Sequence, residues 1–133
     1  MMISAQSSAR QYQQAQFATV DRGQLLLMMF DGAERFLSQA EQQLPADDVA
    51  GFVTALGRAQ AVIAELLSTL DHQRGGEIAR NLDRLYRFML DYLIEANIAK
   101  SVRHVGQVRK ILGIIGNAYR EVLRHGMPQL DVA

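Results

Sequence analysis

Apolar residues recur every three or four positions in four long segments of this chain, and that spacing constrains the fold more than any other feature. Residues three and four apart lie on one side of an α-helix, whereas a strand alternates sides at every residue. No alternating run long enough for a strand occurs. The second segment shows the helical spacing most plainly, at Phe52, Leu56, Ala59, Ile63, Leu66 and Leu70. The sequence therefore predicts an all-α fold.

Capping and turn residues divide this pattern into helices. The first is expected to start at Asp21, whose side chain can cap it together with Gln24, and to run to about Leu44, where Pro45 stops it. Glycine and proline end helices in the same way further along the chain. The remaining helices are expected after the caps Asp47 and Asp48, from Glu77 after Gly75-Gly76 to about Ala99, and from the cap Ser101 to Gly126 and Pro128.

Four helices of similar length joined by short turns favour one architecture, because short connections make neighbouring helices antiparallel. We expect an antiparallel up-down-up-down four-helix bundle over residues 21–126. Residues 1–20 are expected to form an N-terminal arm or a short extra helix that docks through Tyr12 and Phe17, and residues 127–133 a C-terminal tail.

Two of the helices carry more apolar surface than one core can cover. Residues 24–37, QLLLMMFDGAERFL, contain six consecutive apolar side chains that point all around the helix, and the third helix has an apolar arc of about 200°. We assign one stripe of each helix to the core seam and the neighbouring stripe to an exposed surface. The expected core seam comprises Leu25, Met29, Phe36, Ile78, Leu82, Leu85 and Met89. The second stripe comprises Leu26, Phe30 and Leu37 of the first helix and Tyr86, Leu90, Leu93 and Ile94 of the third, and Leu27 points away from both stripes.

The second stripe has two interpretations. Its residues can be flank positions that pack against adjacent helices as the bundle closes. Alternatively, they line a groove for an amphipathic helix of another chain, and flexible methionines suit such a groove. Glycines inside the second and fourth helices, such as Gly57 and Gly113, also have two interpretations. They can allow a tight contact between those two helices, which we favour, or leave a trough for a partner.

Several classes of function are excluded or disfavoured by composition. The 14 basic and 14 acidic residues balance, which argues against nucleic-acid binding. There is no Cys and no Glu-x-x-His pair, so we expect no metal, no cofactor and no catalytic residues. The polar N-terminus does not resemble a secretory signal, and no uninterrupted apolar run approaches the length of a membrane span, so we expect a cytoplasmic protein without membrane insertion.

Two stretches of the sequence resemble a known family. QLLLMMFDGAERFL is similar to the leucine-rich stretch ending in L-Y-D-G-A of the flagellar export chaperones called FliS. GGEIARNLDRLYRFMLDYLIEAN is similar to that family's G-G-E-I-A-x-N-L-x-x-L-Y run followed by A-N. The resemblance extends from about Tyr12 to Leu123.

The resemblance implies a four-helix chaperone that binds the disordered C-terminal segment of flagellin, prevents premature polymerisation and delivers flagellin to the flagellar export apparatus. It also implies contact with an export gate component through the arm near Tyr12, and an arm that can shield the empty groove. Together with the second stripe, it leads us to expect partner contacts at Tyr12, Leu26, Leu27, Phe30, Asp31, Tyr86, Leu90, Ile94 and Asn97.

Two other classes remain open at this point. One is a helical regulator or adaptor that associates with itself, and a homodimer is compatible with the chaperone reading as well. The other is a small enzyme or cofactor carrier. The stripe assignment also predicts that Tyr86→Asp weakens peptide binding more than folding, and that Leu82→Asp does the reverse.

Overall fold

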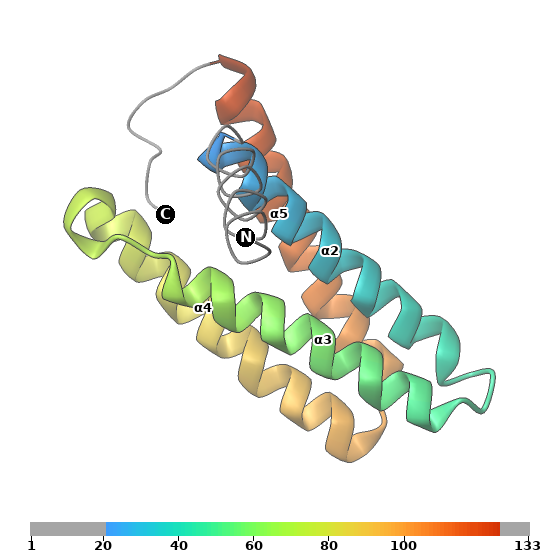
Figure 1. The fold of residues 1–133 in the computed structure, drawn as a ribbon. Helices are drawn as coiled ribbons and strands as arrows, with labels where there is room; N and C mark the ends of the chain where they lie inside the picture. Colours follow the sequence, from blue (N-terminus) through green and yellow to red (C-terminus); the bar gives the residue numbers. More distant parts are fainter. Residues whose placement is uncertain (1–20, 126–133) are drawn as a thin grey trace, which may run out of the picture.

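A computed structural model describes residues 21–125, which form four α-helices (Figure 1). Helix α2 packs against α3 and α5, and α4 packs against the same two helices, so the four make an antiparallel bundle. The fold class predicted from the spacing of apolar residues is confirmed. The expected arm and tail, including Tyr12 and Phe17, lie outside the described residues. The helices are α2 (Arg22–Gln43), α3 (Val49–Ser68), α4 (His72–Ala99) and α5 (Val102–His125).

Capping side chains begin each helix where the sequence offers them. Asp21 accepts a hydrogen bond from the backbone N–H of Gly23 at 3.3 Å, and Asp48 accepts one from Gly51 at 2.9 Å. The Ser101 hydroxyl accepts one from the N–H of His104 at 3.2 Å. These bonds satisfy N–H groups that have no partner inside the helix. The expected caps Asp21, Asp48 and Ser101 are therefore confirmed, and of the two candidates for α3 it is Asp48 that caps the helix.

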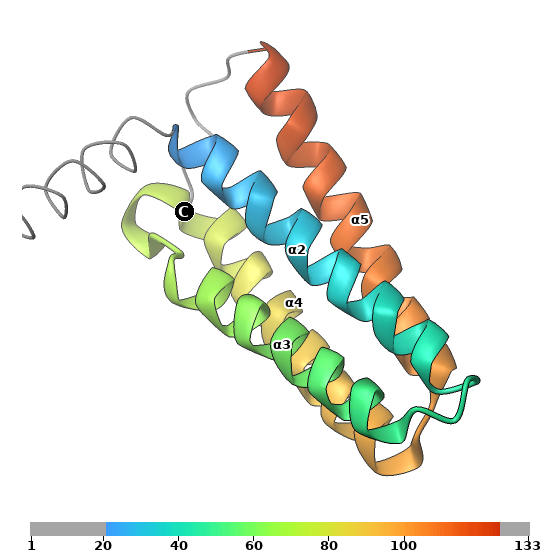
Figure 2. The same cartoon turned by 45° about the vertical axis from the view of Figure 1, so that its right-hand side comes forward.

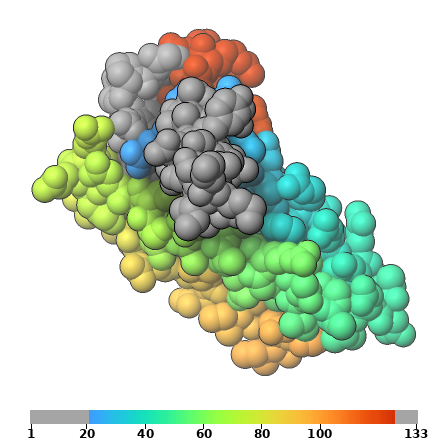
Figure 3. Space-filling model, in the orientation of Figure 1, coloured from blue at the N-terminus to red at the C-terminus, as the bar shows by residue number. Residues whose placement is uncertain are grey.

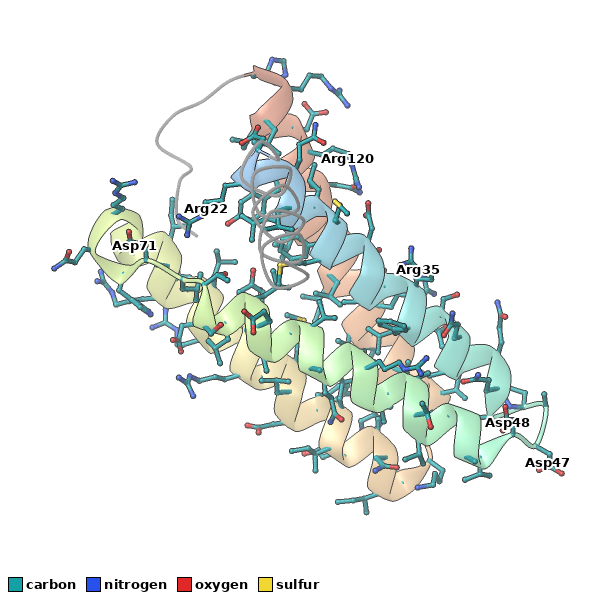
Figure 4. All side chains as sticks on the ribbon, in the orientation of Figure 1. Arg22, Arg35, Asp47, Asp48, Asp71 and Arg120 are labelled. Carbon is teal, nitrogen blue, oxygen red and sulfur yellow. The ribbon has the colours of Figure 1, made fainter. Side chains whose placement is uncertain are left out.

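The expected helix from Glu77 after a left-handed glycine is present as the long part of α4, but one short turn precedes it. The sequence placed the start of α4 at Glu77, after a glycine turn, but α4 begins at His72 because Asp71 caps it, accepting from the N–H groups of Gln73 and Arg74 at 3.1 Å (Figure 4). Gly76 lies inside the element with φ of +53°. That left-handed conformation, which glycine adopts without strain, turns the chain between a first short turn and the long straight part of α4.

Aromatic rings form the centre of the bundle. The Phe30 ring of α2 lies 5.5 Å from the Tyr119 ring of α5 and 6.5 Å from the Tyr86 ring of α4, measured between centroids. Aliphatic side chains from all four helices surround these rings, and no polar or charged residue is buried in the described part of the chain. Other members of this core are Leu37, Phe52, Leu56, Ile63, Met89, Leu93, Val108 and Leu112.

The assignment of the two stripes on α2 and α4 was largely reversed. Phe30 is fully buried and Tyr86 is 2% exposed, although both were expected on the surface, whereas Leu25 and Ile78 of the expected core seam are 46% and 48% exposed. Relative to the expected orientation, α4 is rotated about its axis by roughly half of the 100° step between residues, and α2 by nearly a whole step. This rotation buries the rings of Phe30 and Tyr86, which remove more apolar area from water than Leu25 and Ile78 would.

Glycines of α5 do not contact α3. The sequence favoured a tight contact between these two helices, but they lie diagonally across the bundle, and the α5 glycines face α2 instead. A Cβ atom added to Gly116 would lie 3.4 Å from the Cβ of Phe30, so this glycine lets α2 and α5 approach closely. Gly57 of α3 faces open space.

Helix α3 corrects a further expectation. Its 20 residues are long and apolar enough to cross a membrane by length and composition alone, although we expected no such segment. Only two charged residues, Arg58 and Glu65, interrupt it, and its alanines and glycines made the segment look less apolar than it is. A core helix passes the same test, so this is weak evidence for a membrane span. Of the 18 consecutive residues of α3 that are most apolar, only 33% are buried.

Candidate functional site

An apolar groove opens between α4 and α5, which we call the α4–α5 groove. It has a volume of about 230 Å³ and only apolar surface at its wall. The first turns of α4 and the last turns of α5 diverge here (Figure 2), so side chains between them are left partly open to solvent. It is lined by Ile78, Leu82, Ile114, Ile115, Ala118, Tyr119 and Val122.

The other half of the α4–α5 junction is closed. Tyr92 of α4 donates a hydrogen bond to the side-chain oxygen of Gln107 in α5. Its ring also stacks on His104 at 4.3 Å and on Phe88 at 5.3 Å. The contacts with Gln107 and His104 join the two helices near their connecting turn, and the groove begins where they stop.

A second recess lies between α2 and α3, which we call the α2–α3 recess. It is more open than the groove and has a volume of about 500 Å³. Met28 is 65% exposed at its edge, and Glu65 is its one charged lining residue. The lining residues are Leu25, Met28, Met29, Gly32, Ala61, Val62 and Glu65.

Both openings lie at one end of the bundle. The recess involves the start of α2 and the end of α3, and the groove involves the start of α4 and the end of α5. In an antiparallel bundle these four ends lie toward the same pole, where the ends of α2 and α5 spread away from those of α3 and α4 (Figure 1). The α2–α3 and α4–α5 junctions are on opposite sides, so one long guest would have to pass across that pole to reach both.

Ion pairs close the α2–α5 junction between these openings. Arg120 donates to both carboxylate oxygens of Asp31, at 2.7 and 3.0 Å, and Arg109 pairs with Glu41. Burial, and then the neighbouring carboxylate of Asp31, raises the pKa of Glu34 above its ordinary value. This junction is charged and filled, so it offers no apolar surface comparable with the groove.

The structure separates the residues that the sequence assigned to partner binding. Leu26, Phe30 and Tyr86 are core residues, and a partner cannot reach them without opening the bundle. Burial raises the pKa of the Tyr86 hydroxyl, with Tyr119 adding to the effect, so the hydroxyl stays neutral. The remaining assigned residues have other positions: Leu27, Leu90 and Asn97 are half-buried, Asp31 and Ile94 are exposed, and Tyr12 lies outside the described residues.

Residues expected in the core seam instead supply much of the open surface. Leu25 and Met29 line the α2–α3 recess, and Ile78 and Leu82 line the α4–α5 groove. Phe36 and Leu85 are half-buried, and Met89 alone of that set is fully buried. Partner binding by any of these residues stays a prediction.

Sequence reasoning missed the α5 side of the groove. Ile114, which is 63% exposed, and Ala118 were not singled out. A signal for them exists in the sequence. Ile111, Ile114, Ile115 and Ala118 widen the apolar arc of the fourth helix in the same way as the arcs of the first and third, and a wheel of that helix would have indicated a second stripe.

Comparison with known proteins gives a consistent result. A family model described as "Flagellar protein FliS" matches residues 4–126. The chain is 36% identical over 100 residues to the flagellar secretion chaperone FliS of Salmonella typhimurium, covering 74% of each chain. It is 32% identical over 112 residues to flagellar secretion chaperone FliSB of Pseudomonas aeruginosa, covering 81% of this chain and 89% of the relative. With the Bacillus subtilis FliS it shares 28% identity over 93% of this chain and 96% of the relative.

These similarities, together with the bundle and its apolar openings, define a helical chaperone rather than an enzyme. The chain belongs to the FliS family of flagellar secretion chaperones.

Proposed function

We propose that this protein binds the disordered C-terminal segment of flagellin in the cytoplasm, prevents its premature polymerisation, and delivers it to a gate component of the flagellar export apparatus. One observation carries the proposal: the α4–α5 groove presents a wholly apolar wall that the single chain leaves open. Apolar surface of this kind on a soluble chain is the usual mark of a site for another protein.

The groove suits a guest that becomes helical on binding. A helix lays residues spaced three and four apart into an apolar trough between two other helices. Ile78 and Ile114, 48% and 63% exposed, lie on opposite walls, where they can contact such a stripe from both sides. A disordered guest loses conformational entropy as it orders, so it needs a long apolar contact to offset that cost.

The test is calorimetric titration of the protein with a peptide that carries the C-terminal segment of flagellin. Ile78→Asp and Ile114→Asp place a carboxylate on each wall of the groove and should weaken binding by about 2 kcal/mol or more, because the charge must be desolvated under the guest. Both residues are exposed, so the bundle should keep its melting temperature.

Ile98→Asp is the matched control. Ile98 lies on the same helix and is 80% exposed, but it does not line the groove. It should leave affinity within about 0.5 kcal/mol of wild type. Equal affinity for all three variants, or no heat with the wild-type protein, would contradict the proposal.

A further inference from the structure

The three methionines within residues 21–125 lie in different surroundings. Met28 of α2 is 65% exposed at the edge of the α2–α3 recess, Met29 is half-buried in its lining, and Met89 of α4 is fully buried in the core. The α2–α3 junction lies on the face shown in Figure 3, where α2, in blue and cyan, borders α3, in green. A peroxide in solution can reach the Met28 sulfur directly, whereas it reaches the Met89 sulfur only when the bundle opens.

The chemistry of oxidation at Met28 requires only access to its sulfur. A thioether does not have to lose a proton before it reacts, and the chain has no cysteine whose thiol would compete for the oxidant. A peroxide transfers one oxygen atom to the sulfur: the O–O bond breaks, an S–O bond forms, the sulfur loses two electrons, and hydrogen peroxide leaves as water. The product, methionine sulfoxide, is polar and is reduced back by dedicated reductases that use a dithiol.

The recess offers no partner for the new oxygen. A sulfoxide oxygen accepts hydrogen bonds, but no residue that lines the recess carries a side-chain donor, and the ionised carboxylate of Glu65 only accepts. On α2 the flanking donors are Gln24, four residues before Met28, and Arg35, seven residues after it, and neither lines the recess. The sulfoxide oxygen would therefore hold water in a recess that is otherwise apolar.

We propose that Met28 is a reversible oxidation site, at which a peroxide converts the α2–α3 recess from an apolar to a polar surface. The change is confined to this opening, because no methionine lines the α4–α5 groove. It leaves the bundle intact, since Met28 is mostly exposed. Oxidation of Met89 would instead place a polar group in the core and disrupt its packing.

Peptide mass spectrometry of the full chain during treatment with dilute hydrogen peroxide tests the site. Met28 should gain an oxygen before Met29 does, and Met89 should react at least about tenfold more slowly than Met28, because it must wait for the bundle to open. Protein oxidised at Met28 but not at Met89 should keep its melting temperature in circular dichroism. Reductases for both sulfoxide epimers, supplied with a dithiol, should remove the oxygen from this exposed site.

The effect on the recess is measured with Nile red, a neutral dye that fluoresces on apolar surfaces. Every sample carries Ile114→Asp, which makes the α4–α5 groove polar, so that the dye reports on the recess. Oxidation should weaken dye binding at least about fivefold, because the sulfoxide oxygen loses its water under the dye and gains no donor. Met28→Gln, which places a polar carbonyl on a side chain of similar length, should show the weaker binding without any oxidant.

Met28→Leu is the matched control. It keeps an apolar side chain of similar volume but has no sulfur at position 28. Its dye binding should not change under the peroxide treatment that oxidises Met28 and spares Met29 in the unsubstituted chain.

Four results would overturn the inference. One is oxidation of Met29 or Met89 as fast as that of Met28. Another is a sulfoxide at position 28 that the two reductases leave in place. The third is dye binding that falls equally in Met28→Leu, or that Met28→Gln leaves as tight as in the unoxidised protein. The fourth is a recess that binds no dye before oxidation.

Discussion

At the scale of single residues, the structure exchanges the roles of neighbouring side chains. Tyr86 is 2% exposed, and Leu82 lines the α4–α5 groove. We expected Tyr86→Asp to weaken peptide binding more than folding, and Leu82→Asp to do the reverse. The buried position of Tyr86 reverses the first of these two expectations: Tyr86→Asp should mainly weaken folding. A carboxylate at position 86 would be buried among Phe30 and Tyr119 without a partner, and the bundle should not tolerate it. Leu82 is only half-buried, so its substitution affects groove and fold together.

Glu34 is the residue whose protonation should change stability. Burial, followed by the charge of Asp31, raises its pKa above 4.5 in the folded protein, against the opposing effects of Arg120 and Arg109. When a carboxyl group has a higher pKa in the folded protein than in the unfolded protein, the folded state binds more protons. Its contribution to stability is then fully present below the unfolded pKa and is lost as the pH rises through the folded pKa.

Glu34→Gln should therefore raise the free energy of unfolding at pH 7, by less than about 1 kcal/mol because solvent screens a half-buried group. The advantage should vanish below the ordinary pKa of glutamate. Urea titrations at both pH values measure it, and Glu77→Gln, an exposed group on α4, is the control. A variant that is less stable at pH 7, or equally stabilised at both pH values, would refute this account.

At the scale of elements, replacing a glycine by alanine should change stability in opposite directions in α3 and α4. Gly57 and Gly76 both face open space, so an added methyl group clashes with nothing at either position. Gly57 lies within a regular helix, whereas Gly76 has φ of +53°. The two positions differ in backbone conformation and not in packing, which makes them a matched pair.

Gly57→Ala should stabilise the protein by up to about 1 kcal/mol, since alanine loses less backbone entropy in an exposed helix position. Gly76→Ala should destabilise it by about 1–3 kcal/mol, since an L-residue is strained at that φ. Thermal unfolding followed by circular dichroism distinguishes the two signs. Should Gly76→Ala melt at or above the wild-type temperature, the first turn of α4 would not require the left-handed conformation.

At the scale of the whole molecule, the two poles of the bundle differ in how well they are closed. Near the α4–α5 turn, Tyr92 joins α4 to α5 through Gln107 and His104. At the other pole, the groove and the recess leave apolar side chains in solvent on opposite sides. An opening at one pole allows a guest to bind while the rest of the core keeps its packing.

This difference predicts a pattern of amide hydrogen exchange. The first turns of α4 around Ile78 should exchange faster than the middle of α2 around Phe30, because fewer packed neighbours resist local opening. Flagellin peptide should slow exchange around Ile78 and in the last turns of α5, and leave the turn at Lys100 unchanged. Mass spectrometry of peptic fragments measures both. Uniform exchange along α4, or protection only at Lys100, would contradict the assignment of the guest to the groove.

The sequence by itself determined the helical class, the four elements and most of their starts. Caps and the three- and four-residue spacing act locally, so Asp21, Asp48 and Ser101 could be found without knowing any neighbour. The two quoted stretches were also sufficient for the family, which the comparisons then showed.

Only the tertiary structure decided how each helix is rotated about its own axis. An apolar arc of about 200° lets several rotations bury a full stripe, so one helix alone cannot choose between Leu25 and Leu26 or between Ile78 and Tyr86. The choice depends on how four surfaces fit together: the rings of Phe30, Tyr86 and Tyr119 meet in one core, over the space that Gly116 leaves. Such packing is a property of all the helices at once, and it also decides which apolar residues remain for a partner.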